Sequence, residues 1–181
     1  MSRFLPKQNA QPHPGYATRS DFCNRLEDDM GPLYLLAFLL TGNHAAAERC
    51  FVTTVEDAVR EDCVFKGWER IWIKRCLIIN AIRLVFSGPA GSGAKPDSWC
   101  KFDVASWGPS TIDAVARLAP PLQRFVFVMS VLEKYSDRED ALLLGCTSQA
   151  VVEARIAALG QLPSLNPTLT ETAEQNGTYG G

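Results

Sequence analysis

The segment from residue 87 to residue 110 places the strongest limit on how this chain can fold. It reads SGPAGSGAKPDSWCKFDVASWGPS, which is rich in Gly, Ser and Pro and has no sustained helical period. Loops of this length are uncommon inside a compact domain, so the segment predicts a linker between two domains. Its aromatic residues suggest that part of the linker docks on a surface; they are Trp99, Phe102 and Trp107.

Apolar residues recur at helical spacing on both sides of this linker, and the sequence contains no alternating strand pattern of any length. We therefore predict an all-α protein with two small helical domains. The N-terminal domain is expected to span residues 20–86 and the C-terminal domain residues 111–162. Residues 1–19 are expected to form a disordered arm, and the polar, Gly-rich residues 163–181 a disordered tail.

Caps and helix breakers predict where the individual helices begin and end. The N-terminal domain is expected to hold helical segments at 21–40, with a break or bend around Gly31-Pro32, at 44–59 and at 65–86. Asn43 or Thr41 is the expected N-cap of the second segment. The C-terminal domain is expected to hold helices at 111–118, 121–133, 136–144 and 148–162.

The composition argues against a protein that holds nucleic acid by its overall charge. The formal net charge is −2, whereas a small protein that binds nucleic acid by charge alone is usually basic. Any contact with DNA must therefore come from a local basic face or be assisted by a partner protein.

Motifs for catalysis or metal binding are missing from the sequence. The six cysteines form no CxxC pair and only two histidines are present, so we expect buried, reduced thiols and no metal site. The Gly-rich stretch at 88–93 lacks the Lys-Ser/Thr of a phosphate-binding loop, and no GxSxG motif occurs. The sequence predicts a protein that is not an enzyme and needs no cofactor.

The start of the chain, MSRFLPKQNAQPHPGY, lacks the apolar core of a signal peptide. The apolar stretches at 33–40 and 71–86 are too short or too charged to span a bilayer. We therefore expect a cytoplasmic protein that does not bind a membrane.

The clearest local pattern is a helix-turn-helix at 136–160. Ser136 and Glu139 have the spacing of a capping box, Gly145 suits a left-handed C-cap, and Thr147 suits the next N-cap. Two short helices joined by such a turn match the DNA-reading motif, although a plain helical hairpin has the same features. The expected inward face is Val151, Ala154, Ile156 and Leu159, and the expected DNA-facing residues are Thr147, Ser148, Gln149, Val152 and Arg155.

A second candidate surface lies on the third predicted helix. Lys66, Arg70 and Lys74 follow one another at intervals of four residues, so they are expected to form a basic stripe. Trp68 and Trp72 are also four residues apart. Cations interleaved with aromatic side chains suit single-stranded DNA, and the alternative is a solvated helix face with buried tryptophans. The predicted DNA-binding set of this half is Lys66, Trp68, Arg70, Lys74 and Arg75.

Residues 118–159 resemble the C-terminal domain, region 4, of extracytoplasmic-function sigma factors of the sigma-70 family. The matching residues stand in the family's order and spacing; they are Leu118, Pro120, Pro121, Gln123, Arg124, Val126, Phe127, Glu133, Tyr135, Ser136, Glu139, Ala141, Leu144, Gly145, Thr147, Val151, Val152 and Arg155. The first half resembles region 2 more loosely, through the residues at 33–37, 40–43, 47–48, 72–75 and 80–81.

This resemblance implies a transcription initiation factor. The C-terminal domain would read the −35 element of promoter double-stranded DNA, and the N-terminal domain would bind core RNA polymerase and hold the −10 element. By this resemblance, the expected polymerase-binding residues are Glu48, Arg49 and Val52. The run at 49–54, RCFVTT, lacks the acidic residue and the Gln-Glu pair by which the family docks on polymerase. The alternative is therefore a degenerate sigma-fold adaptor that binds a regulatory protein of the anti-sigma type.

Overall fold

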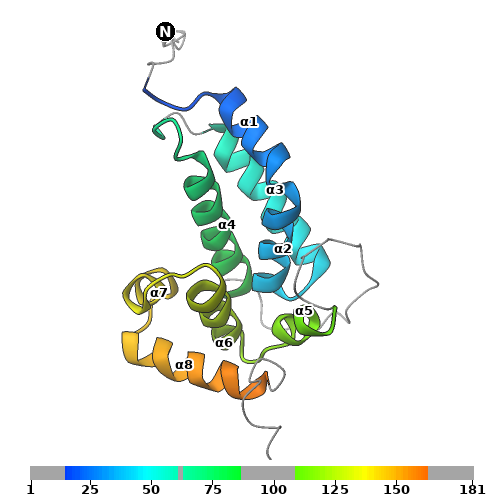
Figure 1. Ribbon diagram of the computed structural model, residues 1–181, viewed down its shortest axis with the longest axis vertical. Helices are drawn as coiled ribbons and strands as arrows, with labels where there is room; N and C mark the ends of the chain where they lie inside the picture. The colour runs from blue at the N-terminus through cyan, green and yellow to red at the C-terminus, as the bar shows by residue number, and fades with distance from the viewer. Residues whose placement is uncertain (1–14, 61–62, 87–108, 163–181) are drawn as a thin grey trace, which may run out of the picture.

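The computed structural model describes residues 15–60, 63–86 and 109–162 (Figure 1). All regular secondary structure in these ranges is helical, apart from one isolated bridge between Tyr16 and Phe65. The all-α prediction is therefore confirmed. The predicted tail at 163–181, most of the predicted arm and residues 87–108 of the predicted linker lie outside the described residues.

The N-terminal half contains α1 (Arg19–Asp28), α2 (Met30–Thr41), α3 (His44–Arg60) and α4 (Glu69–Phe86). In Figure 1, α4 runs along one side of α2 and α3, with α1 at the upper end of the group. Asn43 caps α3 as predicted, because its side-chain Oδ1 accepts the Ala46 N–H at 3.0 Å.

Three helix ends in this half differ from the prediction. The first helix begins at Arg19 because Thr18 and Asp21 form a capping box. The break before α2 falls at Asp29 and not at Gly31-Pro32, because Pro32 lies in the first turn, where its missing N–H is not needed. The helix expected from residue 65 begins at Glu69, because residues 64–66 hydrogen-bond instead to residues 15–17, at 2.7 and 3.1 Å.

The C-terminal half contains α5 (Pro109–Ala116), α6 (Pro121–Val126), the π-helix η1 (Phe127–Leu132), α7 (Asp137–Leu144) and α8 (Ser148–Gln161). The helix expected at 121–133 thus changes its hydrogen bonding at Phe127, and the Glu133 N–H bonds five residues back, to the Val128 carbonyl at 3.0 Å. Residues 124–129 are all buried. A helix enclosed on all sides has no polar face, so its sequence period could not reveal the change.

The two halves pack against each other. One hydrophobic cluster includes Phe22 and Ile73 from the first half together with Val115 and Met129 from the second. The rings of Phe86, at the end of α4, and Phe125, in α6, lie 5.2 Å apart. The two groups of helices that the sequence predicts therefore share a core, and the separate folding of either group stays a prediction.

Arg124 in α6 joins the two halves through main-chain carbonyls. Its side chain donates to the Leu40 and Thr41 carbonyls at the end of α2, at 2.9 and 3.2 Å. It also donates to the Ala116 and Leu118 carbonyls at the end of α5, at 3.2 and 3.4 Å. Carbonyls at a helix C-terminus have no partner within the helix, so one buried guanidinium satisfies the ends of two helices. We call this contact the Arg124 junction.

No single helix in the described ranges is both long enough and apolar enough to cross a membrane. Taken together, α7 and α8 meet both conditions, but the pair is bent by 103°.

Candidate nucleic-acid interface

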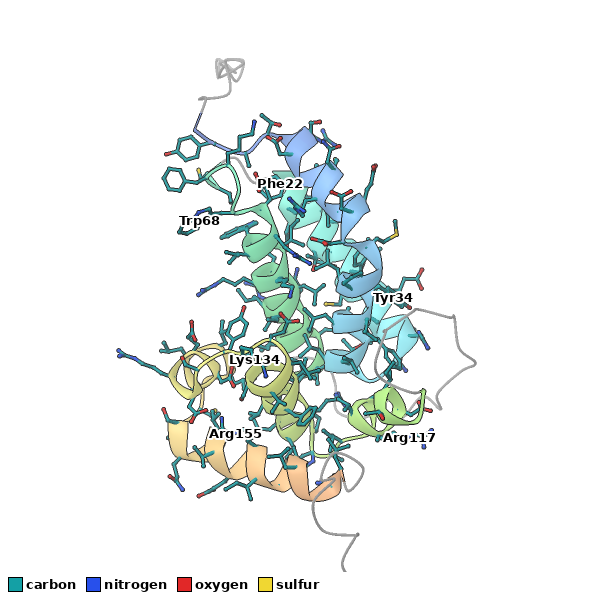
Figure 2. The ribbon with its side chains drawn as sticks, in the orientation of Figure 1. Phe22, Tyr34, Trp68, Arg117, Lys134 and Arg155 are labelled. Carbon is teal, nitrogen blue, oxygen red and sulfur yellow. The ribbon has the colours of Figure 1, made fainter. Side chains whose placement is uncertain are left out.

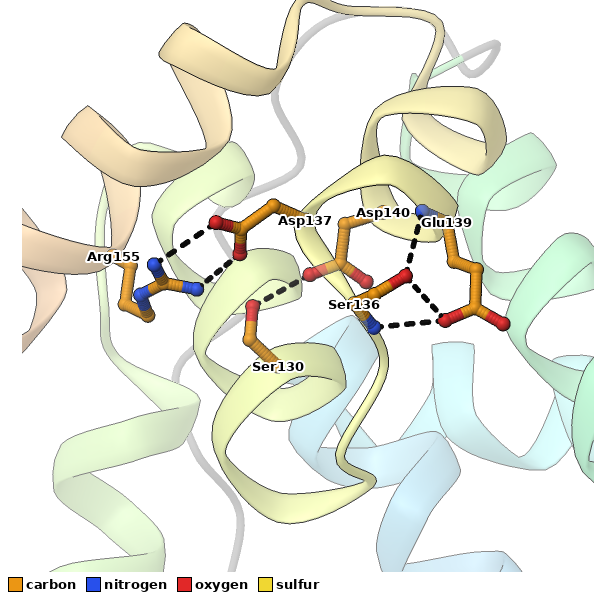
Figure 3. A network of polar contacts seen from close by, with 6 residues as sticks. All are labelled: Ser130, Ser136, Asp137, Glu139, Asp140 and Arg155. Carbon is orange, nitrogen blue, oxygen red and sulfur yellow. Dashed lines mark hydrogen bonds and ion pairs between the residues drawn. The ribbon is translucent and has the colours of Figure 1, made fainter.

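The ends of α7 and the start of α8 are held by the local contacts that the sequence predicts, of which Figure 3 shows the capping box at the start of α7. The Glu139 carboxylate accepts the Ser136 N–H at 2.8 Å, and Ser136 Oγ accepts the Glu139 N–H at 3.3 Å. Gly145 has a φ of +66°, in the left-handed region, and ends α7. Thr147 Oγ1 accepts the Ala150 N–H at 3.1 Å and begins α8. The capping box, the glycine C-cap and the threonine N-cap are therefore confirmed.

The angle and the core of this corner suit a helix-turn-helix. The bend of 103° between α7 and α8 falls within the range of about 90–120° found in the DNA-reading motif. Val151 and Ala154 are buried against Val126 and Ala141. These contacts fix α8 relative to α7 and leave the opposite side of α8 exposed.

The prediction that Ile156 and Leu159 belong to the inward face of α8 was wrong. Ile156 is 65% exposed and Leu159 is also exposed, while Ala158 is buried in their place. Val151, Ala154 and Ala158 are spaced by three and four residues, so they lie on one stripe of the helix. Ile156 lies five residues after Val151, which turns its side chain away from that stripe.

The residues expected to face DNA lie on or near the outer side of α8. Thr147, Ser148 and Gln149 are exposed, whereas Val152 and Arg155 are half-buried. The Gln149 side-chain amide donates to the Glu153 carboxylate at 2.9 Å. The first turn of α8 thus presents polar groups that suit base edges, and one of them is paired within the helix.

Arg155, which the sequence predicts to face DNA, forms an ion pair within the chain. Its two terminal nitrogens, Nη1 and Nη2, donate to the two carboxylate oxygens of Asp137, the second at 3.2 Å (Figure 3). The hydrogen bond from Arg155 lowers the pKa of the Asp137 carboxyl below its usual value. The one cation among the residues expected to face DNA is therefore held by the first residue of α7.

Asp140 is a buried carboxylate behind the same corner. It is 0% exposed, and its Oδ2 accepts the Ser130 hydroxyl of η1 at 2.5 Å. Its Oδ1 is buried and has no hydrogen-bond partner within the described part of the chain. Burial raises the pKa of Asp140 above its ordinary value of 3.8, and the nearby Asp137 and Glu139 also raise it.

We expect Asp140→Asn to make the stability of the protein less dependent on pH. Because the folded-state pKa of Asp140 is raised, its stabilising effect is present below pH 3.8 and is lost as the pH rises through the raised value. The free energy of unfolding of the variant should therefore increase relative to wild type as the pH rises. Urea denaturation at pH values from about 4 to 8 measures this, and a difference that stays constant with pH would contradict the prediction.

The predicted basic stripe on the third helix is largely paired with carboxylates. Lys66 lies before the start of α4, within 4.0 Å of Asp21. Arg70 lies 3.0 Å from Asp29. Lys74 donates to Glu133 at 2.5 Å, which links α4 to the end of η1. The prediction that all three cations lie on one helix was wrong for Lys66, and all three face carboxylates of the same chain. Arg75 is an exposed cation of the predicted set, with no ion pair among the described residues.

Exposed aromatic and apolar side chains gather at the N-terminal end of α4. Trp68 is 61% exposed, and Phe65 and Ile71 are exposed as well. Trp72 is half-buried against the core, and its ring N–H has no partner within the described residues. These side chains and Arg75 line one depression in the surface. In Figure 2, Trp68 lies at one end of α4 and Arg155 lies on α8, near the other.

The three predicted polymerase-binding residues lie together. Glu48, Arg49 and Val52 of α3 line a groove whose other wall includes Asn80 and Arg83 of α4. Asn80 is buried, and its side-chain amide donates to the Asp57 carboxylate at 2.9 Å and to Thr54 Oγ1 at 3.3 Å. We call this surface the α3–α4 groove.

Sequence reasoning did not place Asp137, Asp57 or Arg83 in either candidate surface. Asp57 and Arg83 lie on opposite walls of the α3–α4 groove, and Asp137 controls the environment of Arg155. A signal for Asp137 was present in the cluster of acidic residues in the first turn of α7, but its partner depends on how α8 packs. Among the described side chains, no group of three or more His, Cys, Asp or Glu residues is placed to hold a metal ion.

Comparison of the chain with protein-family models found no match, and neither did comparison with curated proteins or with solved structures.

Proposed function

We propose that this protein is a sigma-like transcription initiation factor, which binds promoter DNA through α7 and α8 and core RNA polymerase through the N-terminal helices. The observation that carries the proposal is the capped corner of 103° whose second helix presents Ser148 and Gln149 at its exposed start. The first turns of the second helix are the part of this motif that enters the major groove. The resemblance of residues 118–159 to region 4 supports the same function.

The reading face of α8 suits a modest contact with duplex DNA. Gln149 can pair with the N6 and N7 edge of adenine, and Ser148 can bond to a base or a phosphate. The half-buried Val152 suits contact with a thymine methyl group. With Arg155 engaged by Asp137 and a net charge of −2, this face cannot rely on phosphate contacts for affinity. Binding to a promoter therefore needs a second contact.

The N-terminal half offers two surfaces for this second contact. The α3–α4 groove has apolar and charged lining residues, including the exposed Val52, and suits a protein segment of mixed character. The depression lined by Trp68, Trp72 and Arg75 suits unpaired bases, because an exposed indole can stack on a base while a cation meets a phosphate. The groove is the proposed polymerase-binding surface, and the depression the proposed −10 contact.

Val52→Asp is expected to abolish the binding of core RNA polymerase while duplex DNA binding by the isolated protein stays unchanged. The substitution replaces an exposed apolar side chain in the α3 wall of the α3–α4 groove with a charged one, far from α8 in the sequence. Co-sedimentation with purified core polymerase and promoter-directed transcription measure the effect. Met30→Asp changes another exposed apolar side chain, outside the groove, and is the matched control. Wild-type protein that neither binds core polymerase nor initiates transcription would contradict the proposal.

A second candidate function is an adaptor that binds a regulatory protein and does not initiate transcription. Two observations favour it. Both long polar side chains of the reading face, Gln149 and Arg155, are engaged by carboxylates of the same chain. Leu142 and Ile156, on α7 and α8, are exposed apolar residues of a kind found in protein interfaces. Absence of both duplex binding and core polymerase binding would favour this function over the first.

A further inference from the structure

The ion pair between Asp137 and Arg155 uses the part of the arginine that DNA would need. Both terminal nitrogens of the guanidinium donate to the two oxygens of one carboxylate. The same pair of parallel donors recognises O6 and N7 of guanine, or two oxygens of a phosphate. Arg155 therefore cannot use this end-on pair of donors, Nη1 and Nη2, for Asp137 and for DNA at the same time.

The position of Asp137 is set by contacts that do not involve Arg155. It directly follows Ser136, the N-cap of α7, so the capping box with Glu139 holds the start of the helix in place. The helix dipole also favours a carboxylate in the first turn. Of the acidic residues in this turn, Glu139 bonds to Ser136 and Asp140 bonds to Ser130 behind the corner, whereas Asp137 faces Arg155 (Figure 3).

The pair lies where a ligand of α8 can reach it. The side chains of Arg155 and Asp137 keep 29% and 37% of their surface exposed. A DNA phosphate that approaches Arg155 also approaches the carboxylate of Asp137. The phosphate and the carboxylate are both negatively charged, so they repel each other. Asp137 thus opposes DNA contact by occupying the cation and by adding a like charge beside it.

Accepting the proposed function of α8, we propose that Asp137 is an internal competitor of DNA for Arg155. In the free protein it occupies the end of the guanidinium, and Arg155 contacts DNA only after the ion pair opens. Asp137 is therefore a positioning residue that limits the affinity of the helix-turn-helix for duplex DNA and leaves Ser148, Gln149 and Val152 as the first reading contacts.

The test measures duplex binding by fluorescence anisotropy as a function of salt, with a fluorescein-labelled pool of double-stranded oligonucleotides of randomised sequence. Asp137→Asn and Asp137→Ala are expected to bind the pool about tenfold more tightly than wild type. The plot of the logarithm of the binding constant against the logarithm of the salt concentration should steepen by about one unit of slope. Adding Arg155→Ala to either variant should remove the gain. Unchanged affinity in both single variants would overturn the inference.

Glu153→Gln is the matched control, because it removes one negative charge from α8, leaves the ion pair of Arg155 in place, and keeps a side-chain oxygen that can accept the hydrogen bond from Gln149. Its affinity should rise by less than about threefold. An equal gain in Glu153→Gln and Asp137→Asn would overturn the inference, since the gain would then come from net charge and not from release of Arg155.

A second readout does not depend on DNA. In nitrogen-15 NMR spectra, the Arg155 guanidinium should rotate slowly in wild type and fast in Asp137→Asn. Fast rotation in wild type would overturn the inference. If no form of the protein binds duplex DNA while the slow rotation is present and is lost in Asp137→Asn, the proposed DNA-binding function fails and the restraint of Arg155 by Asp137 stands.

Discussion

Gly42→Ala is expected to lower the free energy of unfolding by about 3–4 kcal/mol, the sum of a strained backbone and a steric clash. Gly42 ends α2 with a φ of +68°, in the left-handed region that L side chains rarely adopt. A Cβ at this position would lie 2.6 Å from the Ala116 carbonyl oxygen and 2.9 Å from Nη1 of Arg124. The substitution would therefore push apart the two halves at the Arg124 junction.

Gly145→Ala separates the two causes. Gly145 has nearly the same backbone conformation, with a φ of +66°, but a Cβ there would meet nothing within 4 Å. Its loss of stability should be about 1 kcal/mol, from the backbone alone. Urea denaturation of both variants measures the difference. Equal losses would mean that the approach of α2 to α5 and α6 does not constrain residue 42.

Arg124→Met should lower the free energy of unfolding by about 3–5 kcal/mol, because the apolar replacement leaves four carbonyls at helix ends without their donor. Arg124 is 9% exposed, so water replaces these bonds poorly. Methionine roughly fills the space, which makes the lost hydrogen bonds the main cause. We also expect faster amide hydrogen exchange at the ends of α2 and α5 than at the centre of α4, because the junction opens before the core.

Arg117→Met is the matched control for this variant. Arg117 lies on the surface after α5 and pairs only with the nearby Asp113 among the described residues, at 3.7 Å. Its replacement should change stability by less than about 0.5 kcal/mol. A loss in Arg124→Met no larger than that of the control would show that the Arg124 junction does not hold the two halves together.

The Arg124 junction bears on the proposed function because the two surfaces proposed to contact promoter elements lie on different halves. Lys74, a predicted DNA-binding residue, pairs with Glu133 across the boundary, and both side chains are largely covered. The contact with the C-terminal half therefore removes one cation from the surface proposed to contact the −10 element. Trp68, just before α4, and Arg75, in α4, stay exposed while the two halves are packed together.

The sequence by itself determined the helical class and the local geometry of the α7–α8 corner. The capping box of Ser136 and Glu139 and the cap of Thr147 join residues three apart in the chain, and the turn at Gly145 needs only the backbone freedom of glycine. Contacts over so short a separation form wherever the helix forms, so residue types at a fixed spacing are enough to predict them.

The tertiary structure alone decided which charges are free and how the halves meet. Three contacts join residues that are far apart in the chain. The bond from Arg155 to Asp137 spans 18 residues, that from Lys74 to Glu133 spans 59, and that from Arg124 to the Leu40 carbonyl spans 84. The outward turn of Ile156 and the burial of Ala158 likewise depend on which stripe of α8 meets α6 and α7. Spacing along the chain carries no information about such partners, because the packing of whole helices decides them. That packing placed Arg155, the cation expected to face DNA, against the carboxylate of Asp137.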